Sequence, residues 1–304
     1  MGVGVHTAIH EVTLVLFTTL GPAGAFACVL AAIVLLMGKP GDDLRGNLCH
    51  MMGLPLVIAT VGLVASSTHL GTPSNALYVL TGVGRSPLSN EVVCAILFLG
   101  VTGAFWLYSF SMHPRAWLLR LGEVAVAALG LLCVGGISLA YDQATIVTWA
   151  TWHTPATIWF GGFGAGALLF LLTVHLAHAS GSLGRGRGLA AVAGAASCAA
   201  CTVCAILQHG AIVGMQNEML GVSELSPHNG LFVAAYAIIS AIAYVVYFRW
   251  AASNLGRRRE GEAQTSVAQS YGRGTLLASA LVLAALFILR FSFYMVHMTV
   301  GISL

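Results

Sequence analysis

Residues 12–37 read VTLVLFTTLGPAGAFACVLAAIVLLM, a run of 26 residues without a charged side chain. About 20 consecutive apolar residues are enough for a helix to cross a bilayer's hydrocarbon core, which is roughly 30 Å thick. A helix is the expected form, because it satisfies its own backbone hydrogen bonds without water. Residues 1–11 contain no Lys or Arg, so we expect this run to be a membrane span and not a signal peptide.

The rest of the sequence has the same character. Of its 304 residues 58% are hydrophobic and 8% are charged, and the mean hydropathy is +0.89. A soluble domain carries roughly 25% charged residues, which excludes a soluble enzyme. A nucleic-acid-binding protein needs a basic face, and the only basic run is Arg257–Arg259. Apolar runs predict eight spans, at 12–37, 48–68, 91–111, 117–141, 155–178, 189–209, 229–250 and 274–298. The predicted fold is an all-α integral membrane protein, a single eight-transmembrane-helix bundle domain over residues 1–304.

The basic residues predict the orientation of this bundle. Eleven of the 13 Lys and Arg lie in the connections after spans one, three, five and seven, and only Arg85 and Arg290 lie elsewhere. The eleven are Lys39, Arg45, Arg115, Arg120, Arg185, Arg187, Arg249, Arg257, Arg258, Arg259 and Arg273. Because cytoplasmic loops carry the excess of Lys and Arg, we expect both termini on the non-cytoplasmic side. On the cytoplasmic side, Glu123 is expected to pair with Arg120 one helical turn away.

The connection between spans two and three, residues 69–91, reads HLGTPSNALYVLTGVGRSPLSNE. Its Gly and Pro residues are too many for one helix, yet it is too apolar to lie free in water. We expect a short helix along the outer membrane interface, with His69 at one end and Glu91 at the other. Simpler explanations remain open: Glu91 could be a helix-dipole partner after a Ser89 or Asn90 cap, and Arg85 a snorkelling or ion-paired residue.

The last span carries an ionisable residue at its outer end. Arg290, Tyr294 and His297 are spaced i, i+4 and i+7, so they share one helix face. Arg290 lies 16 residues after Gly274, about 24 Å along the helix, near the outer boundary of the hydrocarbon. An ionisable side chain at that depth faces protein or a wet cavity. Snorkelling to the interface is the alternative.

These placements suit the oxidation of a quinol, a lipid-soluble donor of two electrons and two protons. His69 and Glu91 are suitable proton acceptors, and Arg290 and Tyr294 could orient the quinol oxygens. Two alternatives stay open. One is an ion- or proton-coupled membrane transporter, in which repeated halves are expected and none is evident. The other is a structural anchor without a quinone site.

Three motifs resemble those of a known family. They are HLGTP at 69–73, VGRSPLSNE at 83–91 and FYMVHMTVG at 293–301. Together with LFTTLG at 16–21 and the 149–166 stretch, they are similar to the membrane anchor subunits of dimethyl sulfoxide reductase, the DmsC family. The similarity runs the length of the sequence.

The resemblance implies a quinol-oxidising subunit of the bacterial cytoplasmic (inner) membrane, with no terminal-acceptor chemistry of its own. Such an anchor oxidises menaquinol and passes electrons to a four-cluster iron–sulfur subunit, which feeds a molybdopterin catalytic subunit. The family's quinol-site His and Glu fall on His69 and Glu91, the expected catalytic pair. Arg85, Arg290, Tyr294 and His297 complete the predicted quinol-binding set. Because the electrons would leave near the outer boundary, we expect the soluble partners on the non-cytoplasmic face.

Neither a metal site nor a redox cofactor is expected in this protein itself. Cys198, Cys201 and Cys204 have part of the spacing of an iron–sulfur ligand run, but they lie within a span among small residues that favour close helix packing. His175 and His178 fall at the cytoplasmic end of span five, whereas a membrane haem needs His ligands buried on facing helices. We therefore expect no haem and no iron–sulfur cluster.

Overall fold

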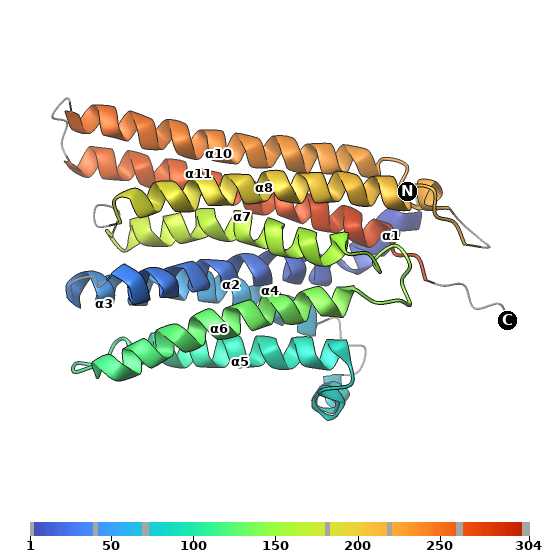
Figure 1. Cartoon of the computed structure of the whole chain (residues 1–304), viewed down its shortest axis with the longest axis horizontal. Helices are drawn as coiled ribbons and strands as arrows, with labels where there is room; N and C mark the ends of the chain where they lie inside the picture. Colours follow the sequence, from blue (N-terminus) through green and yellow to red (C-terminus); the bar gives the residue numbers. More distant parts are fainter. Residues whose placement is uncertain are drawn as a thin grey trace.

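The computed structural model describes residues 3–38, 42–68, 73–179, 183–217, 221–259 and 264–299. These residues form an elongated bundle of helices (Figure 1). The helices are α1 (Val3–His10), α2 (Val12–Gly38), α3 (Asp42–Met51), α4 (Gly53–Ser67), the 3₁₀-helix η1 (Pro73–Gly82), α5 (Pro87–Tyr108), α6 (Ala116–Tyr141), α7 (His153–Leu176), α8 (Arg185–Ile212), α9 (Val222–Leu225), α10 (Asn229–Arg259) and α11 (Gln264–Met295). Within those ranges there is no β-strand, only the isolated bridges Ile146–Thr299 and Gln216–Gly221.

The eight predicted spans are confirmed as helices that are long and apolar enough to cross a membrane. Their bounds are Val12–Met37, Leu44–Ser67, Pro87–Tyr108, Ala116–Tyr141, His153–Leu176, Arg185–Ile212, Asn229–Ser253 and Gly272–Met295. Each predicted span overlaps one of these with edges that differ by a few residues. The short helices α1 and α9 were not expected, because they contain too few residues to give a clear apolar period.

The second span is broken where α3 meets α4. Pro55 has no N–H to donate to the carbonyl of Met51, which weakens the helix at Met52. The indole Nε1 of Trp106 donates to the carbonyl of His50 at 2.8 Å, so a neighbouring helix satisfies a carbonyl beside the break. A side chain at Gly53 would meet that indole at 2.8 Å, so the residue must be small.

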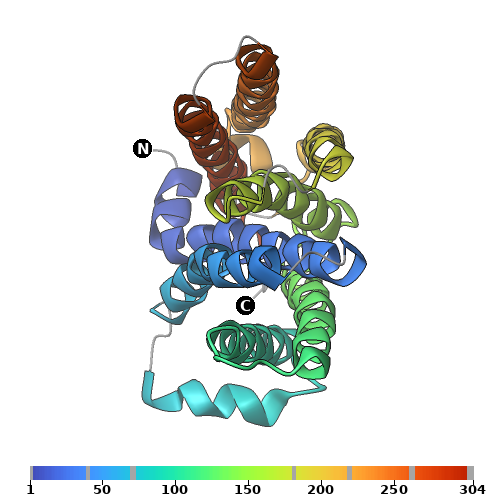
Figure 2. The ribbon, with the colours of Figure 1, turned by 90° about the vertical axis from the view of Figure 1, so that its left-hand side faces the viewer.

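Helix α2 lies in the middle of the bundle. It packs against α4, α6, α7 and α11, while α5 pairs with α6, α8 with α7, and α10 with α11 (Figure 2). The contact between α2 and α7 depends on two glycines. A Cβ atom at Gly162 would lie 2.6 Å from Pro22 Cβ, and one at Gly166 would lie 2.8 Å from the Ala23 carbonyl oxygen. Small residues let the two backbones approach closely, which is how helices associate in lipid.

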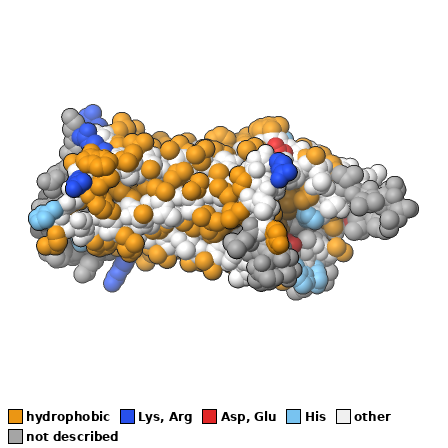
Figure 3. Space-filling view, turned by 90° about the horizontal axis from the view of Figure 1, so that it is seen from below, with side chains coloured by type: hydrophobic (Ala, Val, Ile, Leu, Met, Phe, Trp, Pro, Cys, Tyr) orange, Lys and Arg blue, Asp and Glu red, His pale blue; other side chains and the backbone are white. Residues whose placement is uncertain are grey.

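Hydrophobic side chains cover the middle of the surface, and Lys and Arg gather mainly at one end (Figure 3). At that end, which we name the Arg45 end, the Arg45 guanidinium donates to Oε1 of the fully buried Glu123 at 3.0 Å from Nε and 2.5 Å from Nη2. The hydrogen-bonding partner of Glu123 is therefore Arg45 from α3, while the expected partner, Arg120, acts on the carboxylate only electrostatically. Arg45 from another helix makes the hydrogen bonds to this carboxylate that were expected from Arg120 on the same helix.

The opposite end, which we name the η1 end, carries a short helix within the stretch where one was predicted, while Glu91 lies on the next helix, α5. The 3₁₀-helix η1 lies across the bundle axis beside α5, as Figure 2 shows, and its Tyr78 and Leu80 are exposed. Helix α5 starts at Pro87, and its N-cap is Ser86, whose hydroxyl accepts from the Ser89 N–H at 3.4 Å. Glu91 therefore lies in the second turn, and a dipole partner following a Ser89 or Asn90 cap is the wrong explanation of it.

Candidate functional site

Glu91 carries a buried carboxyl group with one oxygen that receives no hydrogen bond from the described residues. Its residue is only 3% exposed, and it faces α6, where a Cβ at Gly136 would lie 3.3 Å from Glu91 Cα. Its Oε1 makes no hydrogen bond to any of the residues described. Leaving a buried polar atom unsatisfied is costly, and such atoms in folded proteins usually have a partner such as water or a ligand. The carboxyl group is thus a place where a substrate hydroxyl or a proton can be held.

Two tyrosines lie within electrostatic reach of this carboxyl. Tyr141 ends α6 and Tyr294 lies on α11, with their rings edge to face and the ring centroids 5.9 Å apart. Both phenols are within electrostatic reach of Glu91, and Tyr294 Oη also lies near the hydroxyl of Thr18 on α2. Tyr294 is fully buried, and its Oη has no hydrogen bond of good geometry in the described part of the protein. Four helices therefore bring hydroxyl and carboxyl groups to one buried cluster.

An aromatic cluster around Trp149 holds Tyr294 in place. The indole stacks on Phe293 with centroids 4.6 Å apart and meets Tyr294 edge-on at 5.4 Å. Its Nε1 donates to the Phe293 carbonyl at 3.1 Å, and Thr148 Oγ1 donates to the Val296 carbonyl at 2.6 Å. The loop between α6 and α7 thereby fixes the last turn of α11.

His297 lies just past the end of α11, against the same indole, with ring centroids 4.9 Å apart. Burial lowers the pKa of His297 below its usual value, and the nearby Glu11 carboxylate acts in the opposite direction. The imidazole is half-buried, so it lies between the tyrosine cluster and the outside of the η1 end.

The 69–91 motif is described only in part. His69 lies outside the described residues. Arg85 is exposed, and its Nη2 donates to the Thr81 carbonyl of η1 at 3.1 Å. Gly84, with φ of +81°, makes the turn between η1 and α5, and its N–H donates to Asn90 Oδ1 at 2.7 Å. This turn sets where α5 starts and so places Glu91.

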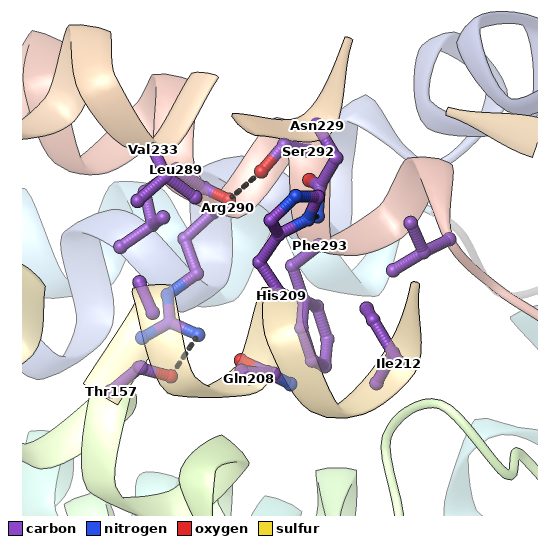
Figure 4. A pocket seen from close by; sticks show the side chains of 12 residues that line it. Thr157, Gln208, His209, Ile212, Asn229, Val233, Leu289, Arg290, Ser292 and Phe293 are labelled. Carbon is purple, nitrogen blue, oxygen red and sulfur yellow. Dashed lines mark hydrogen bonds between the residues drawn. The ribbon is translucent and has the colours of Figure 1, made fainter. Parts of the chain in front are cut away.

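Arg290 is fully buried but turns away from Glu91. Its Nη1 donates to Thr157 Oγ1 of α7 at 3.4 Å, and its guanidinium carbon lies 5.9 Å from the centre of the Phe293 ring. It lines a pocket between α7, α8, α10 and α11 (Figure 4). Arg290 and Tyr294 share a helix stripe, as predicted, yet their polar atoms serve different neighbours. The i, i+4 spacing predicts which face of α11 the two residues share, but it does not predict the direction in which a long side chain points.

Tyr141 is the member of the cluster that sequence reasoning missed. As the last residue of a predicted span, it has no feature that separates it from an ordinary interfacial aromatic. Only the packing of α2 against both α6 and α11 places it beside Tyr294.

Potential metal ligands do not gather in the described part of the protein, where no group of three or more His, Cys, Asp or Glu could hold an ion. Cys198, Cys201 and Cys204 are buried on α8. The Cys201 thiol donates to the Thr157 carbonyl at 3.6 Å, and a Cβ at Gly164 would clash with the Cys198 sulfur. These thiols serve the packing of α8 on α7.

The arrangement can accept a proton from a hydroxyl group at the edge of the membrane. A carboxyl group without a donor is its natural acceptor, and neighbouring phenols can carry the proton onward. Leu88, Ile96 and Leu97 on α5 are exposed, so the helix that carries Glu91 has an apolar outer face.

Comparisons with known proteins agree with one another. The family profile described as "DMSO reductase anchor subunit (DmsC)" matches residues 5–296. The C subunit of anaerobic dimethyl sulfoxide reductase from Escherichia coli (strain K12) is 28% identical over 300 residues, which cover 97% of both sequences. Its counterpart from Haemophilus influenzae is 24% identical over 307 residues, covering 98% of this protein and 99% of the relative. The anaerobic dimethyl sulfoxide reductase subunit YnfH of Escherichia coli is 28% identical over 305 residues, covering 97% of this protein and 98% of the relative.

Proposed function

Because the chain belongs to the DMSO reductase anchor subunit family and so is a multi-pass membrane anchor of a molybdoenzyme complex, we propose that it also oxidises the quinol that supplies the complex. The substrate is menaquinol, and the products are menaquinone, two protons and two electrons. Glu91 and His69 accept the protons. The electrons leave to an iron–sulfur partner subunit with four clusters, which passes them to the molybdopterin catalytic subunit.

The observation that carries this proposal is the Glu91 carboxyl, buried to 3% exposure with an Oε1 that lacks a donor among the described residues. A quinol hydroxyl is such a donor. When the hydroxyl gives up its proton, the carboxyl takes it, which is general base catalysis in the ordinary sense. His69 serves the second hydroxyl, since an imidazole accepts a proton readily near neutral pH.

Tyr141 and Tyr294 take the proton from Glu91 toward the η1 end, where Glu11 and His297 meet water. Their electrostatic reach to Glu91 and their edge-to-face contact support this route. Arg85 orients the quinol ring from the η1 side. Arg290 does not contact the quinol, because its guanidinium donates to Thr157 on α7. It acts as a positioning residue through its electrostatic effect on Tyr294.

The distribution of Lys and Arg supports an orientation of the bundle in the membrane. The η1 end and both termini lie on the non-cytoplasmic side of the bacterial inner membrane, with the soluble partners on that face. The concentration of Lys and Arg in the connections at the Arg45 end supports this assignment. Protons and electrons then leave on the same side, so the protein moves no net charge across the bilayer.

The test is the variant Glu91→Gln in the purified, assembled complex. Quinol oxidation is expected to fall by about 100-fold or more, the usual contribution of a general base. Reduction of the terminal acceptor by a reduced viologen dye, which donates directly to the soluble subunits, should be unchanged. Glu224→Gln is the matched control, because Glu224 is an exposed carboxylate at the same end.

Retention of quinol oxidation by Glu91→Gln would overturn the proposal and favour a structural anchor without a quinone site. Uptake of an ion or solute by vesicles that contain the anchor without its partners would favour the transporter alternative. His69→Gln in the same assay is expected to lower quinol oxidation with the dye-driven rate intact.

A further inference from the structure

The pocket lined by Arg290 lies on the side of α11 away from Glu91. Its walls come from α7, α8, α10 and α11, and its polar members besides Arg290 include Gln208, His209 and Asn229 (Figure 4). Its water-accessible volume is about 20 Å³. A cavity needs roughly 10–15 Å³ of such volume to hold one water molecule. The pocket therefore holds one small species and is too small for a quinone ring.

The charge in this pocket has no counter-ion among the described residues. Arg290 is 1% exposed, and its Nε and Nη2 atoms have no hydrogen-bond partner there. Its ionisable neighbours are the Cys201 thiol and the phenols of Tyr236, Tyr294 and Tyr141. In their ordinary protonation states at neutral pH these groups carry no charge. An isolated buried charge is costly, so something must offset that of the guanidinium.

The polar neighbours of Arg290 are mostly engaged with each other. Gln208 Nε2 donates to Thr154 Oγ1 at 3.1 Å, and Thr157 Oγ1 donates to the Thr154 carbonyl at 3.0 Å. Asn229 Nδ2 lies 3.1 Å from His209 Nδ1. Each of the two amide groups keeps a second N–H. The pocket thus offers the free N–H groups of Arg290 beside the amide groups of Gln208 and Asn229, and none of its described lining residues is a carboxylate.

We propose that this pocket binds one small monovalent anion of about the size of chloride, which neutralises Arg290. A water molecule would accept hydrogen bonds from the free N–H groups but would leave the positive charge uncompensated in a low-dielectric environment. An anion accepts the same hydrogen bonds, which are stronger because they are charge-assisted, and its negative charge also offsets that of Arg290. Glu91 does not line this pocket, although Tyr141 and Tyr294 lie within electrostatic reach of both Glu91 and Arg290. The occupant of the pocket joins four helices, so it stabilises the η1 end of the bundle.

The experiment is thermal unfolding of the complete complex in lipid nanodiscs. The midpoint is measured in sodium gluconate and in increasing sodium chloride or bromide at constant ionic strength. Because a ligand that binds only the folded state stabilises it, the wild-type midpoint should rise saturably by roughly 2–5 °C in chloride and in bromide. Arg290→Gln should show no such rise, and in gluconate it should unfold above the wild type, since it lacks the uncompensated charge.

Two further variants separate charge from fold. Arg290→Lys keeps the cation and should keep part of the halide response. Arg273→Gln is the matched control, an exposed arginine on the same helix, and should respond as the wild type does. An equal halide response in wild type and Arg290→Gln would be a general salt effect and would overturn the proposal. A wild type without any response would overturn it as well.

The location is tested by crystals of the wild-type complex grown in bromide. An anomalous peak within about 3.5 Å of the Arg290 guanidinium nitrogens is expected, the range of a hydrogen bond to a large anion. Its absence, with water alone in the pocket, would refute the proposal even if Arg290→Gln failed to assemble.

Discussion

The rings of Tyr141 and Tyr294 meet edge to face at 5.9 Å in the buried space behind Glu91. Each comes from a different helix, and each phenol lies within electrostatic reach of the carboxyl. The contact therefore joins α6 to α11 near the point where we propose that a proton leaves the quinol.

Replacing either phenol with phenylalanine tests this route. Tyr141→Phe and Tyr294→Phe keep the ring packing and remove only the hydroxyl, so assembly and the dye-driven rate should be unchanged. The quinol-driven kcat is expected to fall by about 10-fold or more, with a smaller change in KM, because proton transfer and not binding is impaired. Tyr108→Phe, which loses a hydrogen bond to the Arg115 N–H at the other end, is the control. Unchanged kcat values in both variants would remove the tyrosines from the proton route.

The ion pair between Arg45 and Glu123 is expected to be a stability feature with no part in quinol oxidation. Glu123 is fully buried and Arg45 is 17% exposed, so Glu123→Ala leaves a partly hydrated charge without its partner, at a cost of about 1–3 kcal/mol. The measurement is the thermal midpoint of the purified complex. The double variant Arg45→Met with Glu123→Leu should recover most of the loss, since apolar residues can replace a buried pair. A double variant as unstable as the single one would show that the charges themselves are needed.

A Gly-to-Ala change is expected to destabilise the protein at the contact of α7 with α2 but not at an open position on α5. Gly166→Ala would place its Cβ 2.8 Å from the Ala23 carbonyl oxygen, so the helices must separate and the complex should be destabilised by about 1–3 kcal/mol. Gly100→Ala on α5 meets nothing within 4 Å, and alanine is the better helix former by up to about 1 kcal/mol. Thermal midpoints should therefore fall for the first and hold or rise for the second. Equal midpoints would mean that the α2–α7 contact is not close-packed in the membrane.

Stability near the end of α11 is expected to fall in mild acid. Because burial lowers the pKa of His297, the unfolded state binds a proton at pH values where the folded state does not. The contribution is thus fully present above about pH 6.5, the ordinary histidine value, and is lost as the pH falls through the lower folded value. The thermal midpoint of the wild type should drop between about pH 7.5 and 5.5 more than that of His297→Gln. Parallel curves would show that His297 does not titrate with unfolding.

The eight spans were predictable because their physical cause is local. A run of some 20 apolar residues is both the requirement for crossing lipid and a property that can be read in one segment. The break at Met52 was not predicted: Pro55 marks a weak point in the helix, but the indole that satisfies the His50 carbonyl beside it comes from Trp106 on another helix. The hydrogen-bonding partner of Glu123 was not predicted for the same reason, since Arg45 reaches it from α3, a different helix.

The candidate site was predictable in its residue types but not in its grouping. Helical spacing predicted that Arg290 and Tyr294 share one face of a helix, and both lie on α11 with that spacing. It could not say that the guanidinium reaches Thr157 while the phenol reaches Tyr141, because those positions depend on which helices pack on each side of α11. The roles of His69 and Arg85 stay predictions that the assays above address.

The central position of α2 has a consequence for how the protein is made. This helix leaves the ribosome before α4, α6, α7 and α11, the neighbours that later enclose it. It therefore enters the bilayer before these neighbours. Because Val12–Met37 contains no charged residue, exposing this helix to lipid places no charged side chain in the hydrocarbon core. The segments that carry Glu91, Tyr141 and Arg290 all follow it in the sequence. Each buried ionisable group therefore enters the bilayer after the uncharged helix at its centre.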